Sequence, residues 1–293
     1  MNKKAMAAFD PRVTPARADL AARELAGRVT AARYVDGCAY EIVAPQVPLR
    51  REPSPDAPLA TEALKGERVT VYETNVEGWI WGQLAADRYV GWLPASALAL
   101  PGAAATHKVT ALRTFAFPGP SIKRPPIEAL PFGARLAIEF VKERMAITSS
   151  GAHVPAAHVA PIDAYETDFV AVAERFLGVP YLWGGKTALG LDCSGLVQIA
   201  LSACGISCPR DSDMQERALG APASVGRDLS ALERGDLVFW KGHVAIVRDD
   251  ENVLHANAFH MAVAIESIAA AVARIRGAGS EITAVRRVSG RSR

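Results

Sequence analysis

The character of the sequence changes near residue 165, and this change constrains the fold more than any other feature. Between residues 40 and 162, short apolar and β-branched runs are separated by Gly, Pro and Asp, a pattern typical of small all-β barrels. Beyond residue 165, two segments with helical spacing of apolar residues come first, and strand-like runs follow from Leu237 onward. Helices followed by an antiparallel sheet predict an α+β domain.

Within the β-rich part, one unit is duplicated. The run that begins at Leu64 can be laid on the run that begins at Leu130. Repetition of a small β unit favours a binding or scaffolding role for this part of the chain. We therefore expect an N-terminal arm with one helix, two small barrels and an α+β domain, at residues 1–39, 40–100, 106–162 and 165–293.

Composition excludes several classes of function. Lys and Arg number 33 against 31 Asp and Glu, so the net charge of +2 gives neither the basic face that nucleic acid needs nor a polybasic membrane anchor. Four cysteines are too few for a disulfide scaffold, and no CxxC pair offers a zinc site. The apolar stretch at residues 5–9 is shorter than the roughly 7–15 residues of a secretory signal. We expect a soluble, reduced, cytoplasmic protein without metal or cofactor, and without nucleic-acid or membrane partners.

Cys193 is the candidate nucleophile. It stands in Asp192-Cys193-Ser194-Gly195, after a Gly-rich approach and directly before a helical pattern. In the first turn of a helix, the macrodipole and the free backbone N–H groups favour thiolate over thiol, and the same N–H groups could hold an oxyanion. Gly195 would let a substrate approach closely. The alternative is a buried structural cysteine at a helix start.

Two histidines in the strand-rich part supply the matching base. His243 opens a strand and could accept the Cys193 proton and return it to a leaving amine. His255 lies on the next strand, and hairpin pairing would bring it beside His243, where a third group orients the imidazole. The alternatives are a surface histidine at 243 and a satisfied core histidine at 255. His260 is expected to be structural.

Six motifs in this order resemble the NlpC-type cell-wall cysteine peptidases, a papain-like group. The motifs are Tyr181-Leu-Trp-Gly-Gly185, Leu191-Asp-Cys-Ser-Gly-Leu196, Arg210-Asp-Ser-Asp-Met-Gln215, Arg234-Gly-Asp-Leu-Val-Phe-Trp240, Gly242-His-Val-Ala-Ile-Val247 and Leu254-His-Ala-Asn257. The resemblance implies Cys193 as nucleophile, His243 as base and His255 as orienting residue. Residues 45–100 similarly resemble a bacterial SH3 domain, and residues 107–162 a degraded second one. The implied fold is thus a papain-like α+β catalytic domain preceded by two SH3-like barrels.

SH3 domains followed by such a catalytic domain resemble the γ-D-glutamyl-L-diamino acid endopeptidases. This resemblance implies cleavage between D-Glu and diaminopimelate in murein tripeptides or tetrapeptides with a free N-terminal L-Ala, as part of cell-wall peptide recycling. Carboxylates and other acceptors would surround the L-Ala ammonium. The implied substrate-binding residues are Tyr181, Asp192, Ser194, Asp211 and Ser212 in the catalytic domain, and Glu62 and Tyr89 in the first SH3 domain.

Several of these residues also have plainer interpretations. Glu62 could be a solvated loop charge, and Tyr89 could be a packed barrel aromatic. Asp211 and Ser212 could form a turn after Pro209.

Two other functions stay open at this point. The protein could bind cell-wall peptides without cleaving them, or it could be a wall-acting hydrolase or acyltransferase on the same fold. Trp79, Trp81 and Trp92 could form a ligand stripe, although packing in the barrel and at a domain interface is favoured. Intact Cys193 and His243 favour an enzyme over a binding protein.

Overall fold

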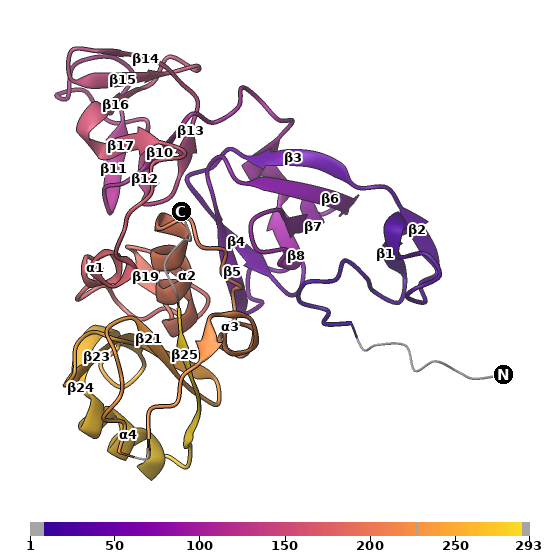
Figure 1. Ribbon diagram of the computed structural model, residues 1–293. Helices are drawn as coiled ribbons and strands as arrows, with labels where there is room; N and C mark the ends of the chain where they lie inside the picture. The colour runs from indigo at the N-terminus through magenta and orange to yellow at the C-terminus, as the bar shows by residue number, and fades with distance from the viewer. Residues whose placement is uncertain (1–8, 227, 289–293) are drawn as a thin grey trace. The chain divides into compact units, whose positions relative to one another are not determined.

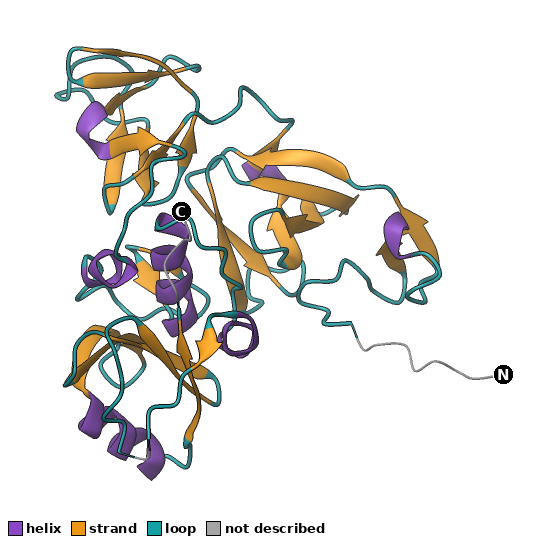
Figure 2. Ribbon diagram, viewed as in Figure 1, coloured by secondary structure: helices purple, strands orange, loops and turns teal. Residues whose placement is uncertain are grey.

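The computed structural model describes residues 9–226 and 228–288. The chain divides into two compact units (Figure 1). Unit 1 comprises residues 1–107, 115–130 and 134–156, and unit 2 comprises residues 108–114, 131–133 and 157–293. In the described part of the chain, all α-helices belong to unit 2, whereas unit 1 consists of strands, short 3-10 turns and loops (Figure 2). None of the described helices has the length and apolarity needed to cross a bilayer.

The centre of unit 1 is an antiparallel sheet of seven strands in the order β5-β4-β8-β7-β6-β3-β9. Its strands and the 3-10 turn η2 are β3 (Cys38–Ile42), β4 (Gln46–Arg50), β5 (Leu59–Leu64), β6 (Arg68–Thr74), β7 (Trp79–Leu84), β8 (Val90–Pro94), η2 (Ala95–Ala97) and β9 (Leu98–Ala99). Alternate residues such as Val47, Leu49, Val69 and Leu84 point into one apolar core. The short strands expected between residues 40 and 100 are therefore present.

The helix predicted in the N-terminal arm is wrong. Its residues form strand β1 (Leu20–Ala22) and the 3-10 turn η1 (Arg23–Leu25), and β1 pairs in parallel with β2 (Arg33–Val35). All three residues of β1 are buried, and Leu20 and Ala22 pack with Trp81 and Trp92. Burial on both faces of β1 outweighs the helix propensity of this Ala-rich segment. Residues 1–8, where a signal segment was sought, lie outside the described residues.

The same arm covers the aromatic surface of the barrel. The Arg17 guanidinium lies 4.4 Å from the Trp81 ring centroid and 5.0 Å from that of Trp92. Asp19 and Glu73 both pair with Arg17 and hold it there. Trp81 is 4% exposed and Trp92 is 9% exposed. These two rings are therefore packing residues, as favoured over a ligand stripe.

Residues 106–162 form short strands. The elements are β10 (His107–Val109), β11 (Arg113–Ala116), β12 (Glu128–Pro131), β13 (Arg135–Leu136), β14 (Ile138–Lys142), β15 (Met145–Thr148), β16 (His153–Pro155), η3 (Ala156–His158) and β17 (Val159–Pro161). Strands β14, β15 and β16 make an antiparallel sheet within unit 1. Other parts of the segment belong to unit 2. That residues 106–162 are a second SH3-like barrel stays a prediction.

Unit 2 contains helices followed by an antiparallel sheet, so the predicted α+β layout is confirmed. Its elements after β17 are α1 (Phe169–Glu174), β18 (Lys186–Thr187), β19 (Gly190–Leu191), α2 (Cys193–Ala203), α3 (Ser212–Ala218), β20 (Ala221–Pro222), β21 (Asp236–Trp240), β22 (His243–Val247), β23 (Asn252–Asn257), β24 (Ala262–Ser267), α4 (Ile268–Gly277) and β25 (Ile282–Arg287). The six-stranded sheet has the order β20-β25-β21-β22-β23-β24. Two details differ: Asp168 rather than Thr167 caps α1, and α4 was not expected.

The two faces of this sheet have different partners. Leu237, Val244 and Leu254 pack with α2 in one core. Their chain neighbours Val238, Ala245 and Val253 join Ala271 of α4 in a second core. This period-two alternation continues along β23, so His255 shares the face of Val253, toward α4. The sheet thus separates the helix that begins at Cys193 from the helix that follows β24.

Candidate active site

A buried ion pair fixes the start of α2. Asp192 is its N-cap, and the carboxylate accepts hydrogen bonds from the backbone N–H of Gly195 at 2.7 Å and of Gly184 at 2.8 Å. Both terminal nitrogens of Arg210 donate to the same carboxylate at 2.8 Å. The Arg210 side chain is 1% exposed, and it also donates to the Ser194 hydroxyl at 2.9 Å. The backbone of the first turn of α2 is therefore held by a fully paired buried charge.

This frame gives Asp192, Ser194 and Gly195 structural tasks that the sequence did not reveal. The side chains of Asp192 and Ser194 are engaged with Arg210, so their implied contact with substrate stays a prediction. A Cβ atom at position 195 would lie 2.3 Å from the carbonyl oxygen of Gly185. The space that glycine leaves is thus filled by the protein's own backbone, and the expectation that it admits substrate is wrong.

Cys193 is the first residue of α2, and its thiol is buried. Burial, together with the Asp192 carboxylate, raises the pKa of the Cys193 thiol to about 12. Hydrogen bonds from the backbone N–H groups of Val244 and Ser194 favour the thiolate but do not offset burial. The expected resting thiolate is therefore wrong, because desolvation outweighs the helix terminus. The cysteine of the free site is a thiol that needs a base.

His243 and His255 lie together as predicted. His243 is the first residue of β22, next to the Val244 N–H that reaches the Cys193 sulfur. The Nε2 atom of His243 is 2.9 Å from Nδ1 of His255, which is 1% exposed on β23. Because His255 occupies Nε2, Nδ1 is the His243 nitrogen left to accept the cysteine proton. The placement of His255 is confirmed, and its catalytic role stays a prediction.

Burial sets the charge state of both imidazoles. It lowers the pKa of His243 to about 3 and the pKa of His255 to about 4. The two rings are therefore neutral around pH 7, and a neutral His243 is able to accept a proton.

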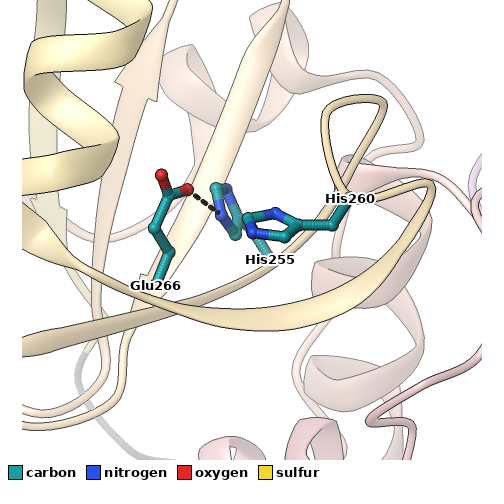
Figure 3. A group of neighbouring side chains, drawn as sticks. All are labelled: His255, His260 and Glu266. Carbon is teal, nitrogen blue, oxygen red and sulfur yellow. Dashed lines mark hydrogen bonds and ion pairs between the residues drawn. The ribbon is translucent and has the colours of Figure 1, made fainter.

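The hydrogen-bonded chain continues to two residues that the sequence analysis missed. His255 Nε2 is 3.1 Å from a carboxylate oxygen of Glu266 on β24 (Figure 3). The Arg274 guanidinium, on α4, donates to both oxygens of Glu266, at 3.0 and 2.6 Å. Glu266 and Arg274 are distant in sequence from every motif of the site. Only the alternation of β24, which places Glu266 on the His255 face, could have indicated Glu266.

His260 lies beside this row of side chains and is held by Asn257. Its backbone N–H and its Nδ1 atom are 2.8 and 3.0 Å from the side-chain oxygen of Asn257, which fits the expected structural role. His255, His260 and Glu266 present ligand-type atoms within 4.8 Å of one another (Figure 3). The Arg274 guanidinium already neutralises Glu266 and would repel a cation, so we assign no metal to this group.

Tyr181 and α3 lie near the nucleophile. Burial raises the pKa of the Tyr181 phenol, and the Cys193 and Asp192 charges raise it further, so the hydroxyl stays protonated. Asp211 and Ser212 stand at the start of α3, and the Asp211 side chain does not cap its own helix. The Gln215 side chain of α3 donates to the carbonyl of Ser194 at 2.9 Å, which ties α3 to α2.

The two remaining predicted residues lie in unit 1. Glu62 is on β5, is 4% exposed and accepts a hydrogen bond from Gln46. The alternative of a solvated loop charge is therefore wrong for Glu62. Tyr89 is buried and packs in the barrel core, as its plainer interpretation predicts. Binding of substrate by either residue stays a prediction.

Comparisons with known proteins agree with this architecture. Residues 178–276 match the NlpC/P60 family, and residues 49–98 match the bacterial dipeptidyl-peptidase Sh3 domain. A γ-D-glutamyl-L-lysine dipeptidyl-peptidase of Bacillus cereus is 28% identical over 68% of this chain and 67% of that protein. The Bacillus subtilis protein of the same name is 37% identical, but the match covers 30% of this chain and 31% of that protein.

A solved structure extends the match to the fold. An NlpC/P60 family protein from Bacillus cereus superposes with a TM-score of 0.72 at 22% identity, over 85% of this chain and 99% of that chain. The chain therefore belongs to the NlpC/P60 family through residues 178–276, and it carries a bacterial dipeptidyl-peptidase Sh3 domain at residues 49–98.

Proposed function

We propose that the protein is a cysteine endopeptidase that cleaves the γ-D-Glu–L-diamino acid bond of murein stem peptides with a free N-terminal L-Ala. The observation that carries the proposal is the hydrogen-bonded pair His243–His255 next to a buried cysteine at the start of α2. Two relatives named γ-D-glutamyl-L-lysine dipeptidyl-peptidase support this class of bond. Our expectation for the diamino acid is diaminopimelate, and lysine is the alternative that the relatives' names supply.

In the proposed reaction, His243 Nδ1 takes the Sγ proton of Cys193 as the sulfur attacks the γ-carbonyl carbon of D-Glu. The new S–C bond leaves an oxyanion, which the backbone N–H groups at the start of α2 and the Tyr181 hydroxyl are placed to stabilise. The imidazolium then gives its proton to the amine of the diamino acid as the C–N bond breaks. Water, activated by His243, hydrolyses the thioester and frees Cys193.

The raised pKa of Cys193 and the lowered pKa of His243 fit this order of events. Burial disfavours both charged forms in the free site, so the resting pair is neutral. Charge separation then accompanies attack on the substrate, when the oxyanion contacts first become available. Binding energy would thus be used in the transition state rather than in the resting enzyme.

We also propose that the enzyme acts on free peptides in the cytoplasm, as part of cell-wall peptide recycling. Asp211 and Ser212 in unit 2, with Glu62 and Tyr89 in unit 1, are the residues proposed to select the L-Ala ammonium. A peptide whose amine is acetylated lacks the charge that such a pocket pairs. Truncating one partner of a buried charge pair costs about 3–5 kcal/mol, which corresponds to roughly two to four orders of magnitude in specificity.

The test is a cleavage assay of the purified full chain, read by mass spectrometry. The substrates are L-Ala-γ-D-Glu-diaminopimelate, its L-lysine counterpart, the N-acetylated form of each and intact sacculi. We expect release of L-Ala-D-Glu from the free peptides and little from the acetylated ones. Equal rates on free and acetylated peptides, or efficient digestion of sacculi, would contradict the recycling role. Tight binding without cleavage would instead identify a peptide-binding protein.

A further inference from the structure

The histidine half of the site ends in a charged pair that has no place in the reaction described above. Glu266 on β24 and Arg274 on α4 form a two-point ion pair, with contacts of 3.0 and 2.6 Å, directly behind His255. Glu266 is 9% exposed in its side chain, and His255 is fully buried. A buried carboxylate facing a buried neutral imidazole is costly unless it has a definite partner. Its position therefore calls for an explanation within the site.

We propose that Glu266, held by Arg274, is a positioning residue that sets the direction of the hydrogen bonds through His255 and thereby leaves Nδ1 of His243 unprotonated. This inference rests on the proposed function and adds two residues to its machinery. Neither residue contacts the reacting atoms, because His255 lies between Glu266 and His243.

The direction follows from donors and acceptors. An ionised carboxylate only accepts, so the 3.1 Å contact requires the proton of His255 to be on Nε2. Nδ1 of neutral His255 is then an acceptor, and the 2.9 Å contact requires His243 to donate from Nε2. Neutral His243 carries one ring proton, so its Nδ1 has a free lone pair. This is the atom that takes the proton from Cys193.

The opposite direction would disable the base. If His255 carried its proton on Nδ1, it would donate to Nε2 of His243, and His243 would then hold its own proton on Nδ1. Such an imidazole cannot accept from the thiol. Arg274 prevents this outcome by keeping Glu266 ionised, since the guanidinium lowers the pKa of the Glu266 carboxyl. Fixing a ring by a carboxylate on its far nitrogen is the same device that orients histidines at metal centres.

The surrounding charges make the roles of Glu266 and Arg274 separable. The titratable and charged groups around the two imidazoles are Cys193 at the start of α2, Glu266 on β24, His260 in the loop before β24, and Arg274 on α4. Glu266 raises the pKa of both imidazoles, whereas Arg274 lowers it. Removing one or the other should therefore shift the acid limb of the activity profile in opposite directions. A merely structural ion pair would not produce opposite shifts.

The first measurement is the pH dependence of kcat/KM with the free tripeptide. In Glu266→Gln, the amide can donate to His255, so both directions become populated. We expect kcat to fall roughly 10- to 100-fold, the range found when a partner that orients a histidine is removed, with KM little changed and the acid limb at lower pH. Arg274→Ala should move the acid limb to higher pH, and Arg274→Lys should restore most of the activity. Glu281→Gln is the matched control, because it breaks an exposed pair with Arg276 and should change nothing.

The second measurement does not depend on activity. Long-range ¹H–¹⁵N spectra of the free protein report which ring nitrogen of each histidine carries a proton. We expect Nε2 to be protonated and Nδ1 unprotonated in both His243 and His255, and a mixture in Glu266→Gln. Identical tautomers in the wild type and Glu266→Gln, or an unmoved pH profile with full kcat, would overturn the inference while the cysteine mechanism stands. If the wild type cleaves no peptide, the proposed function fails, and the spectra still decide the inference.

Discussion

The two halves of the candidate site are built in different ways. Cys193 lies on a helix start that the buried Asp192–Arg210 pair and backbone hydrogen bonds hold in place. His243 stands at the end of a row of side chains that crosses three neighbouring strands and finishes at the partly exposed Arg274. The nucleophile is thus positioned by groups that the fold itself requires. The base is positioned by hydrogen bonds whose direction depends on protonation, so it can be altered without unfolding the chain.

The largest expected effect comes from Cys193→Ala. It should reduce hydrolysis of the free tripeptide to background, because the substitution removes the sulfur that lies beside the Val244 N–H and His243. Stability should change little, since the substitution removes one sulfur atom and keeps the Asp192 cap. The measurement is product formation together with the thermal unfolding midpoint. Wild-type turnover by this variant would refute the mechanism.

A smaller but still large effect should follow from His255→Ala. Loss of the group that orients His243 should lower kcat by roughly 10²- to 10⁴-fold and leave KM little changed, because orientation matters mainly in the transition state. His260→Ala serves as the matched control, since His260 contacts Asn257 rather than the hydrogen-bonded chain. Steady-state kinetics of the two variants decide the question. A larger loss in the His260 variant would reverse the assignment of the third position.

The cysteine half should respond to substitution chiefly through stability. In Arg210→Met, the buried Asp192 carboxylate loses its ion-pair partner, and removing one partner of a buried pair costs about 3–5 kcal/mol. We therefore expect a clear decrease in the free energy of unfolding measured with denaturant. The double variant Arg210→Met, Asp192→Asn should recover part of it, because the unpaired charge is gone. A loss below about 1 kcal/mol in the single variant would contradict the distinction between the two halves.

The smallest effect concerns the reactivity of the free thiol. Below its pKa, a thiol gains about tenfold in thiolate for each pH unit. Because burial raises the pKa of Cys193 to about 12, alkylation by iodoacetamide should keep rising between pH 6 and pH 10. Peptide mapping would separate Cys193 from Cys204, whose pKa is also raised by burial, to about 11. A plateau below pH 7 would restore the resting thiolate that the helix start alone predicts.

Local patterns explain what the sequence revealed about the site. Cys193 precedes a helical pattern, and the hairpin between β22 and β23 is short enough to place His255 beside His243. The α+β order and the small barrel follow equally from periodicity within short windows. Each of these predictions depends on residues that are near one another in the chain.

The features that were missed depend on burial and on long-range contacts. The N-terminal arm has good helix formers, yet the aromatic surface of Trp81 and Trp92 draws it into an extended strand. The thiolate was expected because the helix start is visible in the sequence, whereas the desolvation that outweighs it is not. Glu266 and Arg274 could not be connected with His255 before strand β24 and helix α4 were placed on one face of the sheet.

The most direct test of the central claim is capture of the covalent intermediate. The free tripeptide is mixed with the full-length protein, the reaction is stopped with acid within one turnover, and the digested protein is analysed by mass spectrometry. The account predicts an L-Ala-γ-D-Glu acyl group on the peptide that contains Cys193, removable by hydroxylamine as expected for a thioester. Cys193→Ala should show neither adduct nor product. Product formation by this variant, or an acyl group on another residue, would contradict the account.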